Sequence, residues 1–464
     1  MTDPIQDATL DYFEATAWSG IRELSRSGQE AAWDWEQPQL EKEILHLRRA
    51  AALAATKQMP TVRACQIFTN LGNAFDTVGR FVEAVRYWES ALSLDPDFSM
   101  ARGNLGIGFA IYADALWEGH DRRAFFERAH AELSSVGQDT EPNAGIVFVE
   151  LRRKVEAILK SKVEPRHPLP NEAPGRSSQE RQYRRWCLSE RLFLNPQNDL
   201  AASQPAACDT LTLHSIVVPI WDGPYYHGFF NQLKQEYVSA RWLLYDGMTS
   251  HGSHFSDRRV TLSNTLDYPA YGIGVEKVKL AYRAAYSLFD KMAYFLNHYF
   301  HLGIPERGVR FRTVWYTGGH RRERLSAPFQ ACRNLSLRGL FWLSKDLSED
   351  SPGVREGIEP AAATLREIRN HLEHKYLKVH EIWLRKPEDD SVSAADGLTD
   401  TLAHSVGRGE FEAMAMMMFR LVRASLIYLS LAVASEEHRR AREREPGAIV
   451  PAMALGSYED AWKT

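Results

Sequence analysis

The stretch CQIFTNLGNAFDTVGRFVEAVRYWESALSLDPDF, residues 65–98, sets the fold class of the first third of the chain. Its small and bulky positions recur with helical spacing, at Phe68, Leu71, Gly72, Phe75, Ala84, Trp88, Ala91 and Pro96. Gly72 and Ala84 are small where two helices must cross closely, and Trp88 fills the space beside the crossing. Pro96 favours the first turn of a further helix. The stretch therefore predicts two antiparallel helices and the start of a third.

This spacing resembles the tetratricopeptide repeat (TPR) at all eight signature positions. A degenerate unit follows, with Leu105, Gly106 and Phe109 in its first helix and Ala124, Arg128 and Ala131 in its second. Upstream, residues 5–25 and 37–57 predict another helix pair. Because a single repeat cannot bury both of its faces, we expect these units to stack into a short solenoid. The resemblance implies a protein or peptide ligand on the TPR region.

The chain divides at a proline-rich segment. PRHPLPNEAPGRSS, residues 165–178, has four prolines in its first ten positions, so the helix expected at 144–161 cannot continue through it. We predict a TPR-like domain over 5–162, a linker over 163–180, a second domain over 181–442 and a C-terminal tail over 443–464.

The second domain reads as long helices with irregular connections. Helical periodicity predicts them over 226–249, 271–301, 329–346, 355–386 and 406–442. The segments 211–220 and 309–316 suit minor short strands. The predicted fold class is all-α, a helical solenoid followed by a helical bundle, and the irregular stretch 200–265 has no predicted role.

Composition excludes several classes of protein. Lys and Arg number 56 against 60 Asp and Glu, and the net charge of −4 argues against a chain that coats nucleic acid through bulk charge. The four cysteines are far apart and suggest neither a zinc site nor a disulfide framework. The N-terminus is acidic, and the most apolar segment, 424–435, is too short to span a bilayer. We expect a cytoplasmic protein with no membrane partner.

The strongest candidates for catalytic residues lie in residues 363–383, ATLREIRNHLEHKYLKVHEIW. On a helix the apolar stripe is Leu365, Ile368, Leu372, Tyr376, Val379 and Trp383. Opposite this stripe lie Glu367, Asn370, His374, Lys378 and Glu381. Asn370 and His374 are four residues apart and lie one above the other. A helix that presents Asn and His away from its own core offers them to solvent or to a partner.

Here the sequence resembles the HEPN superfamily, whose signature is Arg, then Asn, Asp or His, then three residues, then His. RNHLEH supplies Arg369, Asn370 and His374, which the resemblance makes the catalytic residues. HepT-type toxins, a HEPN branch, carry a tyrosine two residues after the histidine, and this chain has Tyr376 there, a candidate modification site. The resemblance covers about 180–440.

The motif needs its full length to be informative. With 42 arginines and 16 histidines, an Arg five residues before a His is expected about 1.4 times by chance, and it occurs twice. Requiring Asn, Asp or His after the arginine lowers the expectation to about 0.16, and adding the tyrosine lowers it below about 0.01. Only the register of Arg369 and His374 satisfies both conditions, because Arg366 is followed by glutamate.

The implied activity is metal-independent endoribonuclease chemistry. The 2′-hydroxyl of RNA attacks the neighbouring phosphate, which requires a proton acceptor, a proton donor and stabilisation of the phosphorane charge. Histidine suits the proton steps and arginine suits the phosphorane. HEPN nucleases pair two domains so that two motifs face one cleft, which implies a homodimer. Such architectures resemble bacterial toxins and anti-phage defence effectors.

Two alternatives stay open. In the first, the chain is a non-catalytic TPR–HEPN adaptor that binds protein or RNA. In the second, Arg369 merely pairs with Glu373 at i,i+4 and His374 is a solvated helical residue. HGSH at 251–254, followed by Asp257, has metal-like spacing but suggests no third ligand. No P-loop and no GxSxG motif appears, and we expect neither a cofactor nor a metal.

Overall fold

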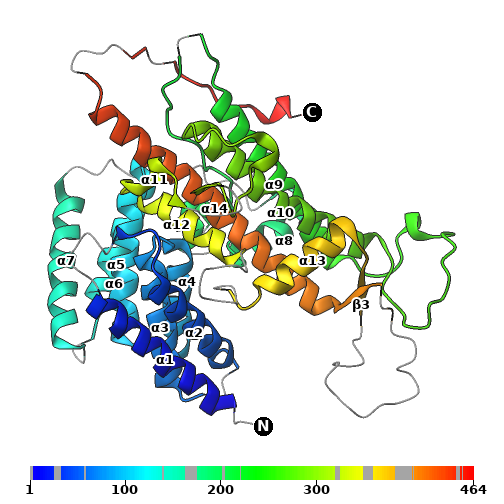
Figure 1. The fold of residues 1–464 in the computed structure, drawn as a ribbon, viewed down its shortest axis with the longest axis horizontal. Helices are drawn as coiled ribbons and strands as arrows, with labels where there is room; N and C mark the ends of the chain where they lie inside the picture. The colour runs from blue at the N-terminus through cyan, green and yellow to red at the C-terminus, as the bar shows by residue number, and fades with distance from the viewer. Residues whose placement is uncertain are drawn as a thin grey trace.

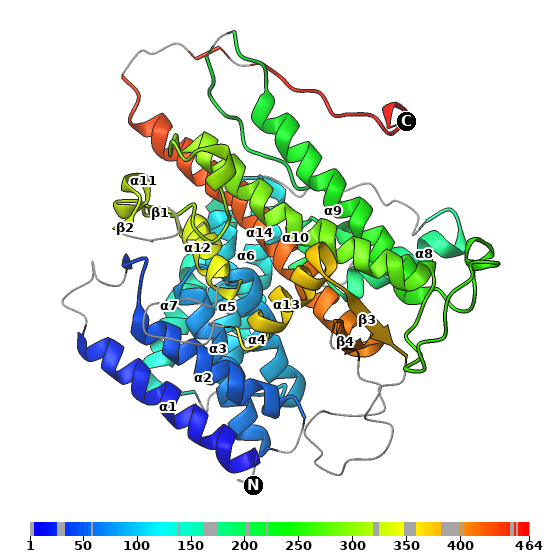
Figure 2. The same cartoon turned by 45° about the vertical axis from the view of Figure 1, so that its right-hand side comes forward.

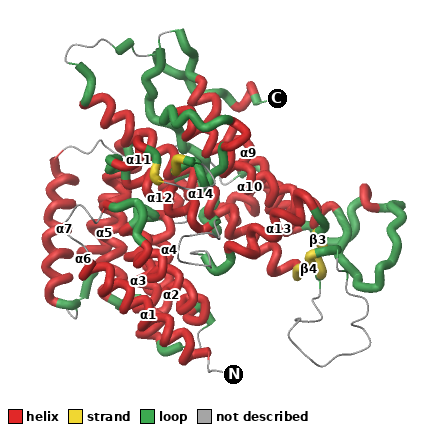
Figure 3. Tube along the Cα trace, in the orientation of Figure 1, coloured by secondary structure: helices red, strands yellow, loops and turns green. Residues whose placement is uncertain are grey.

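The computed structural model is mostly helical, so the all-α prediction is confirmed (Figure 3). Among the described residues, the strands form two short pairs, and the prediction of minor short strands is confirmed. The structure describes residues 4–25, 33–56, 59–137, 140–161, 175–200, 204–219, 221–318, 324–347, 359–381, 400, 402–445, 450–451 and 453–463.

The N-terminal third is a stack of antiparallel helices, the blue-to-cyan block of Figure 1. Its members are α1 (Pro4–Ser25), α2 (Pro38–Ala54), α3 (Thr61–Thr77), α4 (Phe81–Leu94), α5 (Ser99–Ala115), α6 (Gly119–Ser134) and α7 (Pro142–Ser161). Each helix packs on the next in chain order. The bounds of α1, α2 and α7 agree with the predicted helices within a few residues.

The small residues of this stack lie at close crossings, as the sequence predicts for Gly72. A Cβ on Gly72 would stand 2.5 Å from the Trp88 Nε1, and a Cβ on Gly108 would stand 2.2 Å from the same indole ring. The Trp88 Nε1–H donates to the Asn73 Oδ1 at 2.9 Å. Trp88 is therefore wedged between α3 and α5, and only glycine leaves room for it on both sides.

The remaining helices build around α14 (Arg408–Arg442), which crosses the molecule between the N-terminal stack and the pair α9 and α10 (Figures 1 and 2). The other helices are α8 (Ser178–Ser189), α9 (Tyr225–Thr249), α10 (Ile273–Tyr299), α11 (Ala327–Gln330), α12 (Leu335–Asp346) and α13 (Ala362–His374). Short 3₁₀ turns occur at Pro196–Asp199, Gln204–Ala206, Phe255–Asp257, Glu306–Gly308 and Asp460–Trp462. α9 packs on α10, and α10 and α12 pack on α14.

α14 is, among the described residues, the one helix long and apolar enough to cross a membrane by length and composition, but 89% of its most apolar window is buried inside the protein. Arg423 lies in the middle of this helix and is fully buried. Its guanidinium pairs with Asp199 at 2.7 Å and donates to the Phe193 carbonyl at 2.7 Å. The burial and this polar network identify α14 as a core helix of the protein.

The strands differ in place from those expected. Residues 211–219 form no regular element, and at 309–316 the chain turns and only Tyr316 enters a strand. β1 (Tyr316–Thr317) pairs antiparallel with β2 (Arg324–Leu325). β3 (Leu377–His380) pairs in parallel with β4 (His404–Gly407), and β3 falls inside the segment predicted as the helix 355–386.

That predicted helix is wrong in its C-terminal part. α13 ends at His374, Lys375 leaves the helical conformation with φ −137° and ψ −138°, and β3 begins at Leu377. Lys378, expected on a solvated helix face, is only 4% exposed, and its ammonium pairs with Asp267 at 2.6 Å and Asp400 at 2.9 Å. Val379 is buried as predicted, but as part of a strand. Residues 355–358 and 382–386, Trp383 included, lie outside the described residues.

The N-terminal stack and the second region share one apolar core, although the domain boundaries themselves stay a prediction. The fully buried Asp346 of α12 accepts hydrogen bonds from Arg48 of α2 at 2.7 and 2.9 Å and from Arg80 at 2.5 Å. Gly79, with φ +83°, and Gly339 bring two backbones together. A Cβ on Gly339 would stand 2.4 Å from the Gly79 carbonyl oxygen. The two regions therefore pack as one body.

Candidate functional site

The helix that carries the motif, α13, is fixed on α10 by its apolar stripe. Leu365 and Ile368 are buried, in agreement with the prediction. The buried Tyr282 hydroxyl of α10 donates to the Leu365 carbonyl at 2.7 Å. On the exposed flank, Arg283 of α10 donates to the two carboxylate oxygens of Glu373 at 3.1 and 3.2 Å. These contacts set which face of α13 turns away from the protein.

Arg369 lies at the edge between α13 and α10. Its guanidinium lies over the Tyr286 ring, 5.4 Å from the ring centroid, and its Nη1 donates to the Asn370 Oδ1 at 3.1 Å. The stacking fits the preference of a guanidinium for an aromatic face. The hydrogen-bonded partner of Glu373 is Arg283, which is the main reason why the pKa of that carboxyl is lowered, and Arg369 contributes to the same shift through its charge.

His374 is the last residue of α13 and is exposed. Among the described residues it has no hydrogen-bond partner. Asn370 lies one turn before it on the same face and is half-buried. Arg369 and His374 are five residues apart, hence about 140° apart around the helix, and the Arg369–Asn370 bond turns the arginine towards the histidine side. The three motif residues thus lie within the last two turns of one helix.

Tyr376 follows the helix and is 39% exposed. Its hydroxyl bonds the Tyr271 hydroxyl at 3.3 Å, and this bond is the main reason why the pKa of Tyr376 is raised to about 12. The neighbouring Lys378 ammonium anchors β3 to Asp267 and Asp400. The phenol is therefore neutral at physiological pH and open to solvent beside the motif.

The HGSH segment is occupied by other contacts. The His254 Nδ1 bonds Ser256 at 2.8 Å, and Asp257 accepts a hydrogen bond from the Ile273 N–H at the start of α10 at 3.1 Å. Neither the HGSH segment nor Asp257 contributes to any of the three groups of possible metal-binding side chains among the described residues. The basic run 318–324 lies largely outside them, since 319–323 are not described.

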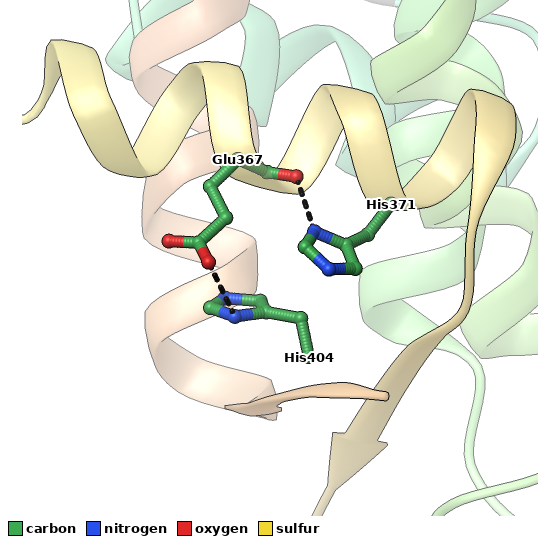
Figure 4. A group of neighbouring side chains, drawn as sticks. All are labelled: Glu367, His371 and His404. Atoms are coloured by element: carbon green, nitrogen blue, oxygen red, sulfur yellow. Dashed lines mark hydrogen bonds and ion pairs between the residues drawn. The ribbon is translucent and has the colours of Figure 1, made fainter. Parts of the chain in front are cut away.

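Sequence reasoning missed one cluster beside the motif. Glu367, His371 and His404 bring one ligand-type atom each to within 4.8 Å of one another (Figure 4). The sequence assigned His371 no role, and His404 lies 30 residues after α13. The i,i+4 spacing of Glu367 and His371 was the one signal available, but the third member comes from the pairing of β3 with β4.

Comparison with known families bears on the same part of the chain. Residues 218–436 match the family model for LA2681-like HEPN. The match runs from before α9 to the last turns of α14, so it includes α13 and all three motif residues. It spans just under half of the chain and supports a HEPN domain there. It also takes in most of the 200–265 stretch. Comparisons with curated proteins and with solved structures give no match.

Proposed function

We propose that the HEPN domain is a metal-independent endoribonuclease that cleaves RNA through attack of the 2′-hydroxyl on the adjacent phosphate. The observation that carries the proposal is the exposed His374 at the end of α13, one turn after Asn370, whose side chain accepts a hydrogen bond from Arg369. An exposed imidazole that makes no hydrogen bond to a described residue is available to exchange a proton with RNA.

Each motif residue has a separate task in this proposal. His374 takes the proton from the 2′-hydroxyl or gives one to the leaving 5′-oxygen. Arg369 offers guanidinium N–H donors to the phosphorane oxygens, where charge develops. Asn370 receives one Arg369 N–H and so holds the guanidinium on the histidine side of the helix. The described face offers one motif histidine, so acid and base work needs a second copy.

A homodimer supplies that second copy. We propose that two HEPN domains meet through the exposed end of α13, so that two His374 imidazoles face one cleft. Lys378 is buried by Asp267 and Asp400 and takes no part in this contact. The neighbouring Lys375 is exposed at the helix end and lies where the partner approaches.

The biological role proposed is that of a bacterial toxin or anti-phage defence effector, with the N-terminal TPR-like helices as the part that senses or binds a protein partner. Asp346 of α12 joins these helices to the HEPN core through Arg48 and Arg80. A ligand that bends the stack is therefore coupled mechanically to the core on which α13 rests.

The experiment is induction of the full chain in bacteria, followed by sequencing of RNA 5′ ends and growth measurement. The proposal expects new RNA ends and growth arrest with the wild type and neither with His374→Ala. Equal numbers of new ends with the two chains would contradict it.

One observation favours a second candidate, a non-catalytic TPR–HEPN adaptor. The Arg369 guanidinium contacts Tyr286 and Asn370 within its own chain, so fewer of its N–H donors are available to a phosphate group. An adaptor would bind RNA or protein equally well with Ala at 374 and would produce no new RNA ends. The same sequencing experiment therefore separates the two candidates.

A further inference from the structure

The cluster of Glu367, His371 and His404 has the composition and spacing of a metal site. Glu367 and His371 lie on successive turns of α13, and His404 is the first residue of β4 (Figure 4). One imidazole nitrogen from each histidine and one carboxylate oxygen lie within 4.8 Å of one another. Ligands around a tetrahedral zinc ion are separated by roughly 3.5 Å. Side-chain rotations that bring the ligand atoms about 1 Å closer together would therefore reach the spacing of a zinc site.

His371 is oriented as a ligand by a backbone carbonyl one turn earlier in α13. The His371 Nδ1–H donates to the Glu367 carbonyl at 2.8 Å, which leaves Nε2 with its lone pair outward. Ligand histidines in proteins are held in this way by a hydrogen bond on the other ring nitrogen. Figure 4 shows the ring held beneath the helix, between the Glu367 backbone and His404.

His404 is placed by the sheet. Its backbone N–H donates to the Tyr376 carbonyl at 2.9 Å, and it is the register partner of Leu377 in the β3–β4 pair. The His404 ring stacks on His371 with centroids 5.0 Å apart. Its Nδ1 stands 3.3 Å from the Glu367 Oε1, longer than an optimal charged hydrogen bond of about 2.8 Å. A metal cation could therefore replace this weak interaction and bind both the Glu367 carboxylate and the His404 imidazole.

We infer that Glu367, His371 and His404 bind one divalent transition-metal ion of the zinc class, which fastens the last turns of α13 to β4. Two imidazoles and one carboxylate match the donor set of zinc sites that keep a fourth position for water. Magnesium and calcium favour oxygen ligands only, so they fit this set poorly.

Two other groups of the described residues are weaker candidates. Asp11, Glu14 and His46 have one imidazole, and His46 already bonds both carboxylates at 2.8 and 3.0 Å. Glu118, His120 and Asp121 also offer one imidazole only. These two groups serve as internal controls. If Zn²⁺ bound to any cluster of histidine and carboxylate, it would bind to them as well as to Glu367, His371 and His404.

The ion would lie one helical turn from His374, on the same face of α13 as Asn370. It would fasten the last turns of α13 to β4 and stabilise this part of the fold. It takes no part in the proton transfers proposed above. The site and the ribonuclease proposal therefore stand or fall separately.

The test is isothermal titration of Zn²⁺ into the full chain after removal of metal by a chelator. Glu367→Gln and His404→Ala should each weaken one Zn²⁺ equivalent at least tenfold. The matched variants His46→Ala and His254→Ala should leave that equivalent unchanged. Zn²⁺ should also raise the melting temperature of the wild type and not that of Glu367→Gln.

Two results would overturn the inference. One is a wild type that binds no Zn²⁺ equivalent in the micromolar range, a result that does not depend on how any variant folds. The other is a Glu367→Gln chain, folded by circular dichroism, that binds Zn²⁺ with wild-type stoichiometry and affinity. Zinc titration requires no RNA, so its outcome is independent of cleavage activity.

Discussion

Substitution of Asp346 by Ala should destabilise the N-terminal stack and the helical core around α14 together. The carboxylate is fully buried, and its pKa lies below the ordinary value because Arg48 and Arg80 outweigh the burial that opposes ionisation. Its loss would leave two buried guanidinium groups with one partner fewer. Removal of one side of a buried pair costs about 3–5 kcal/mol. Arg48 keeps Glu359 at 3.2 Å and Arg80 keeps Glu83 at 2.7 Å, so we expect about 3 kcal/mol.

The assay is urea unfolding followed by circular dichroism, with hydrogen exchange of α2 to α4 and of α12 measured by mass spectrometry. Protection should fall in both regions by a similar free energy, because the carboxylate joins them. Asp460→Ala, which alters an exposed carboxylate in the tail, is the matched control and should change nothing measurable. A loss below about 1 kcal/mol, or faster exchange in one region only, would refute the reasoning.

Three further predictions follow from the packing. The Asp76 Oδ1 is buried with no hydrogen-bond partner among the described residues, and burial raises the pKa of this carboxyl from 3.8 to about 7. Stability should therefore fall as pH rises from about 4 through 7. Asp76→Asn should be more stable than the wild type at pH 8, by up to about 4 kcal/mol, and no more stable at pH 4; thermal melts at both pH values check this. Gly339→Ala should cost about 1–3 kcal/mol in urea unfolding, because its Cβ would meet a backbone carbonyl at 2.4 Å, whereas Gly228→Ala on α9 has free space and should cost nothing. Lys375→Glu should weaken the proposed dimer in light scattering at least tenfold and Lys160→Glu, far away on α7, should not; a fully dimeric Lys375→Glu chain would place the contact elsewhere.

The sequence predicted what helical spacing encodes. The wedge of Trp88 against Gly72 follows from residue size at fixed intervals, and the buried Leu365 and Ile368 follow from the stripe on α13. Both depend on contacts between residues near in sequence. Such contacts can be predicted without knowing how distant parts of the chain pack together.

The features that the sequence did not predict depend on long-range pairing. Helical periodicity continued through Lys378, but the chain leaves the helix at His374 because β3 finds a partner strand in β4. His404 joins the cluster with Glu367 through the same pairing, which no spacing on α13 reveals. The burial of Asp346 between two arginines from α2 and the turn before α4 likewise appears only when both regions are folded.

The most direct measurement of the central claim is the rate at which the purified chain cleaves RNA in the presence of a chelator. The proposed mechanism predicts cleavage with a 2′,3′-cyclic phosphate end, a loss of at least about 100-fold in His374→Ala and no loss in His254→Ala. Circular dichroism and melting temperature should match among the three chains, because His374 is exposed at a helix end. Undiminished cleavage by purified His374→Ala would contradict the account.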